Sequence, residues 1–309
     1  MREEIGRFIL PGLGAASRNT RSLHEWIRGN RFSKVDFQGG ECRLYAYSDD
    51  ELYEAFTPDF QRFAFSSYET FLVAGLERDK FSSMGWPLLK LYYGAFFAAH
   101  AVTRATGNGQ VNLGQDIVRS VNSFVSLIGG DDELKSGTYD ASVREDANGV
   151  FLNLRAPNGG GGVHDGFWRY FSTFLENASS DAVSQGLPSS GDFVRKAAAL
   201  SSCLIEGGGR GAWFSSVRNA INYRHELECW RPSTKKSLPR LMAFPSALRD
   251  TDELELALSE RENELKRFAS VSQYLCSLNY EIINRVINQV SGNTNFSRGW
   301  RSLQAGMQP

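Results

Sequence analysis

Apolar residues recur at intervals of three and four along two long stretches of the chain. In the first, they form one stripe of a predicted helix that Pro87 opens near its first turn. That stripe consists of Leu88, Leu91, Tyr92, Ala95, Phe96, Ala99 and Val102. In the second, within residues 252–290, a stripe runs from Leu265 to Val290. So long a stripe needs a partner helix, either within the chain, which we favour, or from a second copy.

The same periodicity predicts shorter helices elsewhere, and alternating patterns predict two β-hairpins. The helices are expected near 14–28, 114–128, 163–177, 192–206 and 212–230. One hairpin surrounds Gln38-Gly39-Gly40 within residues 34–47, and the other lies within 138–156. We therefore expect a mainly α fold, a helical bundle with one or two small β-hairpin insertions.

Three regions are expected along the chain. Residues 1–65 form a mixed α/β N-terminal segment, and residues 66–290 form the helical bundle with a hairpin insertion near 138–156. Residues 291–309 form a frayed tail.

Composition narrows the class of protein. The 309 residues carry 34 basic and 35 acidic side chains, which argues against a disordered scaffold. The cysteines Cys42, Cys203, Cys229 and Cys276 form no C-x-x-C pair, which fits a reducing compartment. No apolar run approaches the roughly 18 residues of a membrane span, and no export signal opens the chain. We expect a cytoplasmic protein that has no membrane partner.

Common catalytic signatures are absent from the sequence. It has no G-x-G-x-x-G after a strand, no Walker A sequence, no H-E-x-x-H and no G-x-S-x-G, and we expect neither a cofactor nor a metal site. Among the four histidines, His100 lies on a strongly apolar helix and is expected to be structural. The pair His164-Asp165 lies beside a glycine run, but two residues alone make neither a metal site nor a catalytic triad.

Arg218 and His225 are the most informative polar pair. Seven positions separate them, nearly two helical turns, so both would project from the same face of a helix. Their surroundings are basic: residues 210–240 include seven basic and two acidic side chains, a local charge of +5 that could attract phosphate. A solvated basic face is the alternative interpretation.

Two segments resemble helices of the HEPN superfamily of ribonucleases. The predicted helix from Trp86 to Ala101, which contains Tyr92-Tyr93-Gly94-Ala95-Phe96, resembles the YYA-x-F-x-A-A-x-A helix of that family. The segment that begins with Arg218-Asn219 and reaches His225 after six intervening residues is similar to the family's R-x(4–6)-H signature. The β segments have no counterpart in the minimal family bundle.

The resemblance implies a HEPN-like bundle and metal-independent cleavage of RNA, in which a ribose 2′-OH attacks its neighbouring phosphate. It also implies that His225 transfers protons, that Arg218 holds the phosphate and that Asn219 orients either group. The side chains expected to bind substrate are Arg210, Tyr223, Arg224 and Arg231. A homodimer would bring two such histidines into one composite site. As the family resemblance suggests, the protein would be a bacterial toxin or anti-phage defence effector with an antitoxin or regulatory protein as partner.

Alternatives stay open at the level of sequence. A second match, from Arg18-Asn19 to His24, spans six positions and lacks a preceding apolar helix, so we favour the Arg218 match. The chain could instead be a non-catalytic HEPN-like module that binds nucleic acid or protein. In a third interpretation the spacing is accidental, and Arg218 would then be held in an internal salt bridge. Tyr223 could stack on a base or fill the core.

Overall fold

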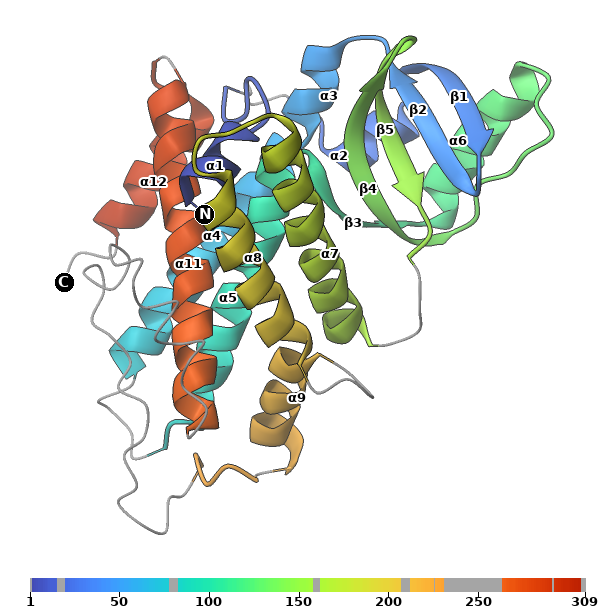
Figure 1. Ribbon diagram of the computed structural model, residues 1–309. Helices are drawn as coiled ribbons and strands as arrows, with labels where there is room; N and C mark the ends of the chain where they lie inside the picture. The colour runs from blue at the N-terminus through green and yellow to red at the C-terminus, as the bar shows by residue number, and fades with distance from the viewer. Residues whose placement is uncertain are drawn as a thin grey trace. The chain divides into compact units, whose positions relative to one another are not determined.

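The computed structural model describes residues 2–15, 20–77, 83–157, 162–206, 212–224, 226–230, 263–290 and 292–306 (Figure 1). The chain divides into two compact units. The helical unit comprises Met1–Arg7, Phe63–Val102 and Gly160–Arg285, and the sheet unit comprises Phe8–Arg62, Thr103–Gly159 and Val286–Pro309. This division differs from the ranges 1–65, 66–290 and 291–309, because each unit gathers segments that are distant in the chain.

The sheet unit contains a five-stranded sheet. Its strands are β1 (Phe32–Gln38), β2 (Glu41–Ala46), β3 (Asn108–Leu113), β4 (Gly137–Asp146) and β5 (Gly149–Arg155). Their order is β1-β2-β5-β4-β3, and all neighbouring strands are antiparallel. The two expected hairpins are present as β1–β2 and β4–β5. They join through β2 and β5, and an unexpected strand, β3, extends the sheet beside β4.

The expectation of a mainly α bundle with one or two small β-hairpin insertions is therefore wrong. The protein combines a helical unit with a five-stranded antiparallel sheet. The physical reason is that an isolated two-stranded hairpin is marginally stable and leaves unpaired backbone groups on both edges. Pairing β2 with β5 satisfies those groups, and it aligns buried Leu44 with Leu152 across the junction.

Short helices complete the sheet unit. Helix α2 (Leu23–Arg28) begins at a capping box in which Ser22 and Glu25 bond each other's backbone, and it packs against α6 (Gln115–Leu127). An edge-on contact between Phe32 and Phe124 joins α6 to the sheet. The unit also contains α3 (Asp49–Ala55) and α12 (Asn295–Ala305). Within the range 14–28, the described helix is thus limited to 23–28. The tail expected to fray contains α12, in which Phe296 stacks on Phe60.

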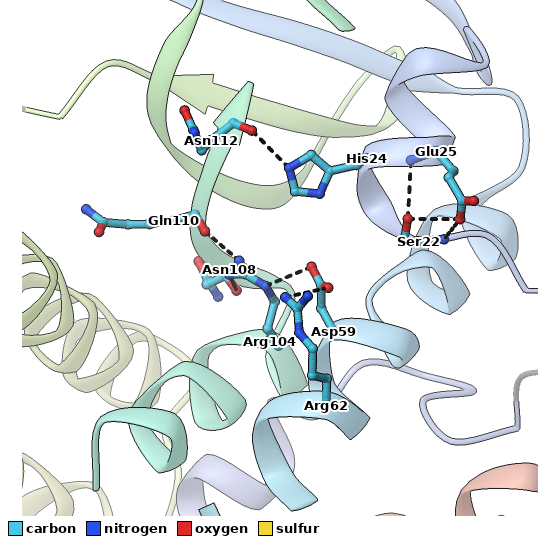
Figure 2. Close-up of polar contacts among 9 residues, drawn as sticks. All are labelled: Ser22, His24, Glu25, Asp59, Arg62, Arg104, Asn108, Gln110 and Asn112. Carbon is cyan, nitrogen blue, oxygen red and sulfur yellow. Dashed lines mark hydrogen bonds and ion pairs between the residues drawn. The ribbon is translucent and has the colours of Figure 1, made fainter. Parts of the chain in front are cut away.

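A buried arginine fixes the start of β3 in the sheet unit (Figure 2). Arg104, at the end of helix α5 (Gly85–Ala105), is only 3 % exposed and donates to the carbonyl oxygens of Asn108 and Gln110. Its Nε lies 3.7 Å from a carboxylate oxygen of Asp59, in the first turn of α4 (Thr57–Glu77). The strand thereby gains polar anchors that neither periodicity nor strand propensity predicts.

Aromatic side chains fill the core of the helical unit. Its helices are α1 (Arg2–Arg7), α7 (Val163–Ser184), α8 (Ser190–Ile205), α9 (Trp213–Asn219), the π-helical turn η1 (Ala220–Arg224), and parts of α4, α5 and α11 (Glu264–Gln289). Tyr92 on α5 stacks on Phe268 of α11, and Phe214 of α9 contacts both Phe268 and Trp168 of α7. The long stripe on α11 is therefore buried within the chain, as favoured.

Two further expectations have clear outcomes in the helical unit. His100 is buried, stacked on Phe167 with ring centroids 3.7 Å apart, which confirms its structural character. The helix expected over 212–230 ends at Arg224, and the described residues 226–230 are not helical.

None of the helices that the structure describes combines the length and apolar character needed to cross a bilayer.

Candidate functional site

Arg218 lies in the last turn of α9, immediately before η1. The helix is anchored because Phe214, Val217 and Ile221 are buried in the aromatic core. The same packing buries Arg218, which is only 8 % exposed. A local change from α to π geometry follows at Ala220, a feature that often occurs at functional sites.

Three tyrosines and one asparagine surround the guanidinium of Arg218. Nη2 donates to the Tyr93 hydroxyl at 2.6 Å, and Nη1 donates to Oδ1 of Asn219 at 2.8 Å. The guanidinium carbon lies 5.4 Å from the ring centre of Tyr223, 5.6 Å from that of Tyr93 and 6.0 Å from that of Tyr92. These contacts hold the planar group in one orientation.

No described carboxylate forms an ion pair with Arg218. Its buried Nε also has no hydrogen-bond partner among the described residues. Burial lowers the pKa of Arg218, but the hydrogen bond to Tyr93 and the nearby tyrosine oxygens outweigh it and hold the pKa above its ordinary value. The site therefore contains a permanent, buried positive charge that the described part of the chain leaves without a counter-ion.

His164, in the first turn of α7, lies against the same tyrosines. Its Nδ1 is 3.1 Å from the Tyr92 hydroxyl, which also accepts a 2.9 Å hydrogen bond from Nε1 of Trp168. Burial of the imidazole and the positive charge of Arg218 lower the pKa of His164. The site thus places a neutral imidazole beside a fixed cation, an arrangement that can bind an oxyanion and hydrogen-bond to it.

Asp165 holds the beginnings of two helices together rather than pairing with Arg218. One carboxylate oxygen accepts from the backbone N–H of Ala212, which precedes α9, and the other accepts from Nε of Arg169 at 3.1 Å. This contact fixes α9 relative to α7, and therefore Arg218 relative to His164.

The structure brings together some of the residues singled out in the sequence. Arg218 and Asn219 are in contact, and Tyr223, which is 65 % exposed, covers Arg218 instead of filling the core. Arg224 points to Glu226, with Nη1 and Oε2 3.4 Å apart, on the exposed surface. His225, Arg210 and Arg231 lie outside the described residues.

Sequence reasoning missed His164, Tyr92 and Tyr93 as members of this site. Two signals were available. The Tyr92-Tyr93 pair places two hydroxyl groups in a mostly apolar helix, and His164 lies at the start of a later helix, α7. Neither signal predicts contact, because α5 and α7 are separated by the whole of β3 to β5 in the chain.

The second match to the R…H pattern has a different environment. Figure 2 shows the contact between Nε2 of His24 and the backbone carbonyl oxygen of Asn112 on β3. The two atoms are 3.0 Å apart. This contact joins α2 to strand β3 of the sheet. Arg18 lies outside the described residues.

Within the ranges that the structure describes, no group of three or more histidine, cysteine, aspartate or glutamate side chains is arranged to hold a metal ion. Comparisons of the chain with models of protein families, with curated proteins and with solved structures find no match.

Proposed function

We propose that this chain is a metal-independent endoribonuclease whose substrate phosphate binds at Arg218. The observation that supports the proposal most strongly is the buried guanidinium without a described counter-ion. A buried charge that lacks a counter-ion is costly, so such a site gains free energy when an anion enters it. The guanidinium is already oriented by Tyr93 and Asn219, which reduces the entropy lost when phosphate binds.

The proposed reaction needs proton transfer as well as charge stabilisation. The ribose 2′-oxygen attacks the phosphorus, the bond to the 5′-oxygen breaks, and a 2′,3′-cyclic phosphate forms. A base takes the 2′-hydroxyl proton, an acid protonates the leaving oxygen, and a cation stabilises the negative charge on the phosphorane. We assign proton transfer to His225 and charge stabilisation to Arg218, with Asn219 orienting Arg218.

The proposal also covers the side chains that would bind RNA, the partners of the protein and its location. Tyr223 is exposed beside Arg218, so a base next to the bound phosphate could stack on its ring. Arg210, Arg224 and Arg231 would add electrostatic attraction for the RNA backbone. From the HEPN resemblance of the two helices we further propose a homodimer that pairs two His225 side chains, an antitoxin or regulatory protein as partner, and a role as a toxin or in anti-phage defence. The proposed cytoplasmic location rests instead on the cysteine pattern, which fits a reducing compartment.

The test is cleavage of labelled single-stranded RNA by the purified chain in the presence of EDTA. We expect products with 2′,3′-cyclic phosphate ends, and loss of cleavage in Arg218→Ala and His225→Ala. Arg195→Ala is a matched control, because Arg195 is exposed and pairs with Asp192 on α8. His24→Ala tests the second R…H match and should cleave normally. Intact RNA at high protein concentration would reject the proposal, and salt-sensitive RNA binding without cleavage would favour the non-catalytic binding module.

A further inference from the structure

We propose that His164 is a second ligand of the oxyanion held by Arg218, and that it acts through Nε2–H as a hydrogen-bond donor. The inference rests on the proposed function for the identity of the anion, a phosphodiester. It assigns a substrate-binding role to a histidine that lies outside the R…H pattern.

We infer from the hydrogen bonds of Tyr92 which nitrogen of His164 carries the proton. The indole N–H of Trp168 can only donate, so it occupies a lone pair of the Tyr92 oxygen. Burial raises the pKa of Tyr92 well above its ordinary value, so the hydroxyl keeps its hydrogen and can direct it to Nδ1 of His164. An imidazole that accepts at Nδ1 carries its proton on Nε2 when it is neutral.

The surroundings of His164 favour this neutral form. Its ring is packed against Phe96, with centroids 4.6 Å apart, and edge-on to Tyr93 at 5.7 Å. The charge that acts on it is the cation of Arg218, and the adjacent carboxylate, Asp165, is engaged by Ala212 and Arg169. Since no described carboxylate supports an imidazolium, His164 donates from Nε2 without first taking up a proton.

The free edge of the ring is what distinguishes this role from simple packing. Nδ1 is used to join α7 to α5 through Tyr92, whereas Nε2 has no hydrogen-bond partner among the described residues. Nε2 is also not fully buried. His164 and Arg218 share Tyr92 and Tyr93 as neighbours, and we infer that one phosphate oxygen accepts from both Nε2–H and the guanidinium.

Two substitutions separate the donor from the ring that carries it. His164→Phe keeps an aromatic ring against Phe96 and Tyr93 but has no N–H. His164→Gln loses the ring but carries an amide group close to the position of Nε2. Binding is measured with a 2′-O-methyl oligoribonucleotide, which cannot be cleaved because its nucleophile is blocked. We expect His164→Phe to weaken binding about tenfold or more, because the lost hydrogen bond goes to a charged group, and His164→Gln to retain most of the affinity.

A second measurement avoids dependence on variants that could fail to fold. Long-range ¹H–¹⁵N correlation spectra of the wild-type protein report directly which nitrogen of His164 is protonated. The expected result is a proton on Nε2 at pH 7.5. A proton on Nδ1, or equal binding by wild type and His164→Phe, would overturn the inference.

The two proposals fail in different ways. If the wild type binds the blocked oligonucleotide and depends on His164 but leaves ordinary RNA intact, the ribonuclease proposal fails and the oxyanion role stands. If RNA is cleaved equally by wild type and His164→Phe, with equal binding, the His164 role fails and the ribonuclease proposal stands. If the wild type binds neither the oligonucleotide nor inorganic phosphate, both are rejected.

Discussion

The guanidinium of Arg218 donates a 2.6 Å hydrogen bond to the hydroxyl of Tyr93, which joins α9 to α5 across 125 positions of the chain. The bond does two things at once. It partly satisfies a buried cation, and it fixes the direction in which the remaining N–H groups point. The Tyr93 hydroxyl accepts in this bond, so its own hydrogen is available to a ligand.

Tyr93→Phe removes this hydroxyl and little else. We expect a loss of about 1–3 kcal/mol of unfolding free energy, because a hydrogen bond to a charged group is lost and Arg218 stays buried. RNA binding should also weaken, since the guanidinium is no longer held in one orientation. Urea unfolding and oligonucleotide binding measure the two effects. Tyr47→Phe is the control, because Tyr47 is 67 % exposed, and it should change neither quantity.

Arg218→Lys tests whether charge alone is sufficient. Lysine keeps the positive charge but cannot donate to Tyr93, Asn219 and a phosphate from one planar group. We expect it to bind the 2′-O-methyl oligoribonucleotide at least tenfold more weakly than wild type. The slope of log affinity against log salt should stay nearly unchanged, whereas Arg218→Ala should lower its magnitude by about one. Wild-type affinity in Arg218→Lys would show that the oriented fork is not needed.

The sequence pattern predicts the elements of this fold better than their assembly. The apolar stripe of α5 and the glycine turn at Gly39-Gly40 are local signals, and both elements form where expected. The pairing of β2 with β5 joins residues more than 100 positions apart, and no local pattern encodes it. Strand β3 was missed for a related reason: Arg104 anchors it through backbone carbonyls, which any sequence can provide.

The candidate site shows the same separation between local and long-range information. Arg218, Asn219 and Tyr223 lie close together because they are neighbours on one helix and the turn that follows it. His164 joins them only through the packing of α7 on α5, which depends on the Tyr92 hydroxyl and the aromatic core. A sequence motif can therefore find one side of such a site but not the side contributed by another helix.

Gly109 is predicted to stabilise the sheet unit, because a larger residue there would clash with Arg104. Its φ is +157°, and a Cβ there would lie 1.0 Å from Nη1 of Arg104, which donates to Asn108. Gly109→Ala must displace a guanidinium that is almost fully buried, so we expect a loss of more than about 2 kcal/mol of unfolding free energy. Gly75→Ala on α4 is the matched control: nothing lies within 4 Å of its Cβ, and it should gain up to about 1 kcal/mol. Equal stability of the two variants in urea would contradict the Arg104 anchor.

The cysteines are predicted to be unreactive in the folded protein. All four are free and buried, and burial raises the pKa of Cys42 and Cys276 to about 12 and that of Cys203 to about 11. Since the thiolate is the reactive species, a disulfide reagent at pH 8 should modify the native protein slowly and all four thiols rapidly in denaturant. Rapid reaction of one thiol under native conditions would locate a part of the chain that opens easily.

His164 should make the protein less stable as the pH falls below neutrality. Burial and Arg218 lower its folded pKa, while in the unfolded chain the pKa returns to about 6.5. Below that value the unfolded state binds a proton that the folded state resists, so the unfolding free energy declines as the pH falls toward the lowered folded pKa, and the contribution is constant below it. His164→Gln lacks this titration, whereas the other titrating groups are common to both proteins. We therefore expect the stability of wild type relative to His164→Gln, measured by urea unfolding, to be constant above about pH 7.5 and to decrease at lower pH. A relative stability that rises as the pH falls would mean that the fold favours the imidazolium, and would argue against a neutral donor facing Arg218, Tyr92 and Tyr93.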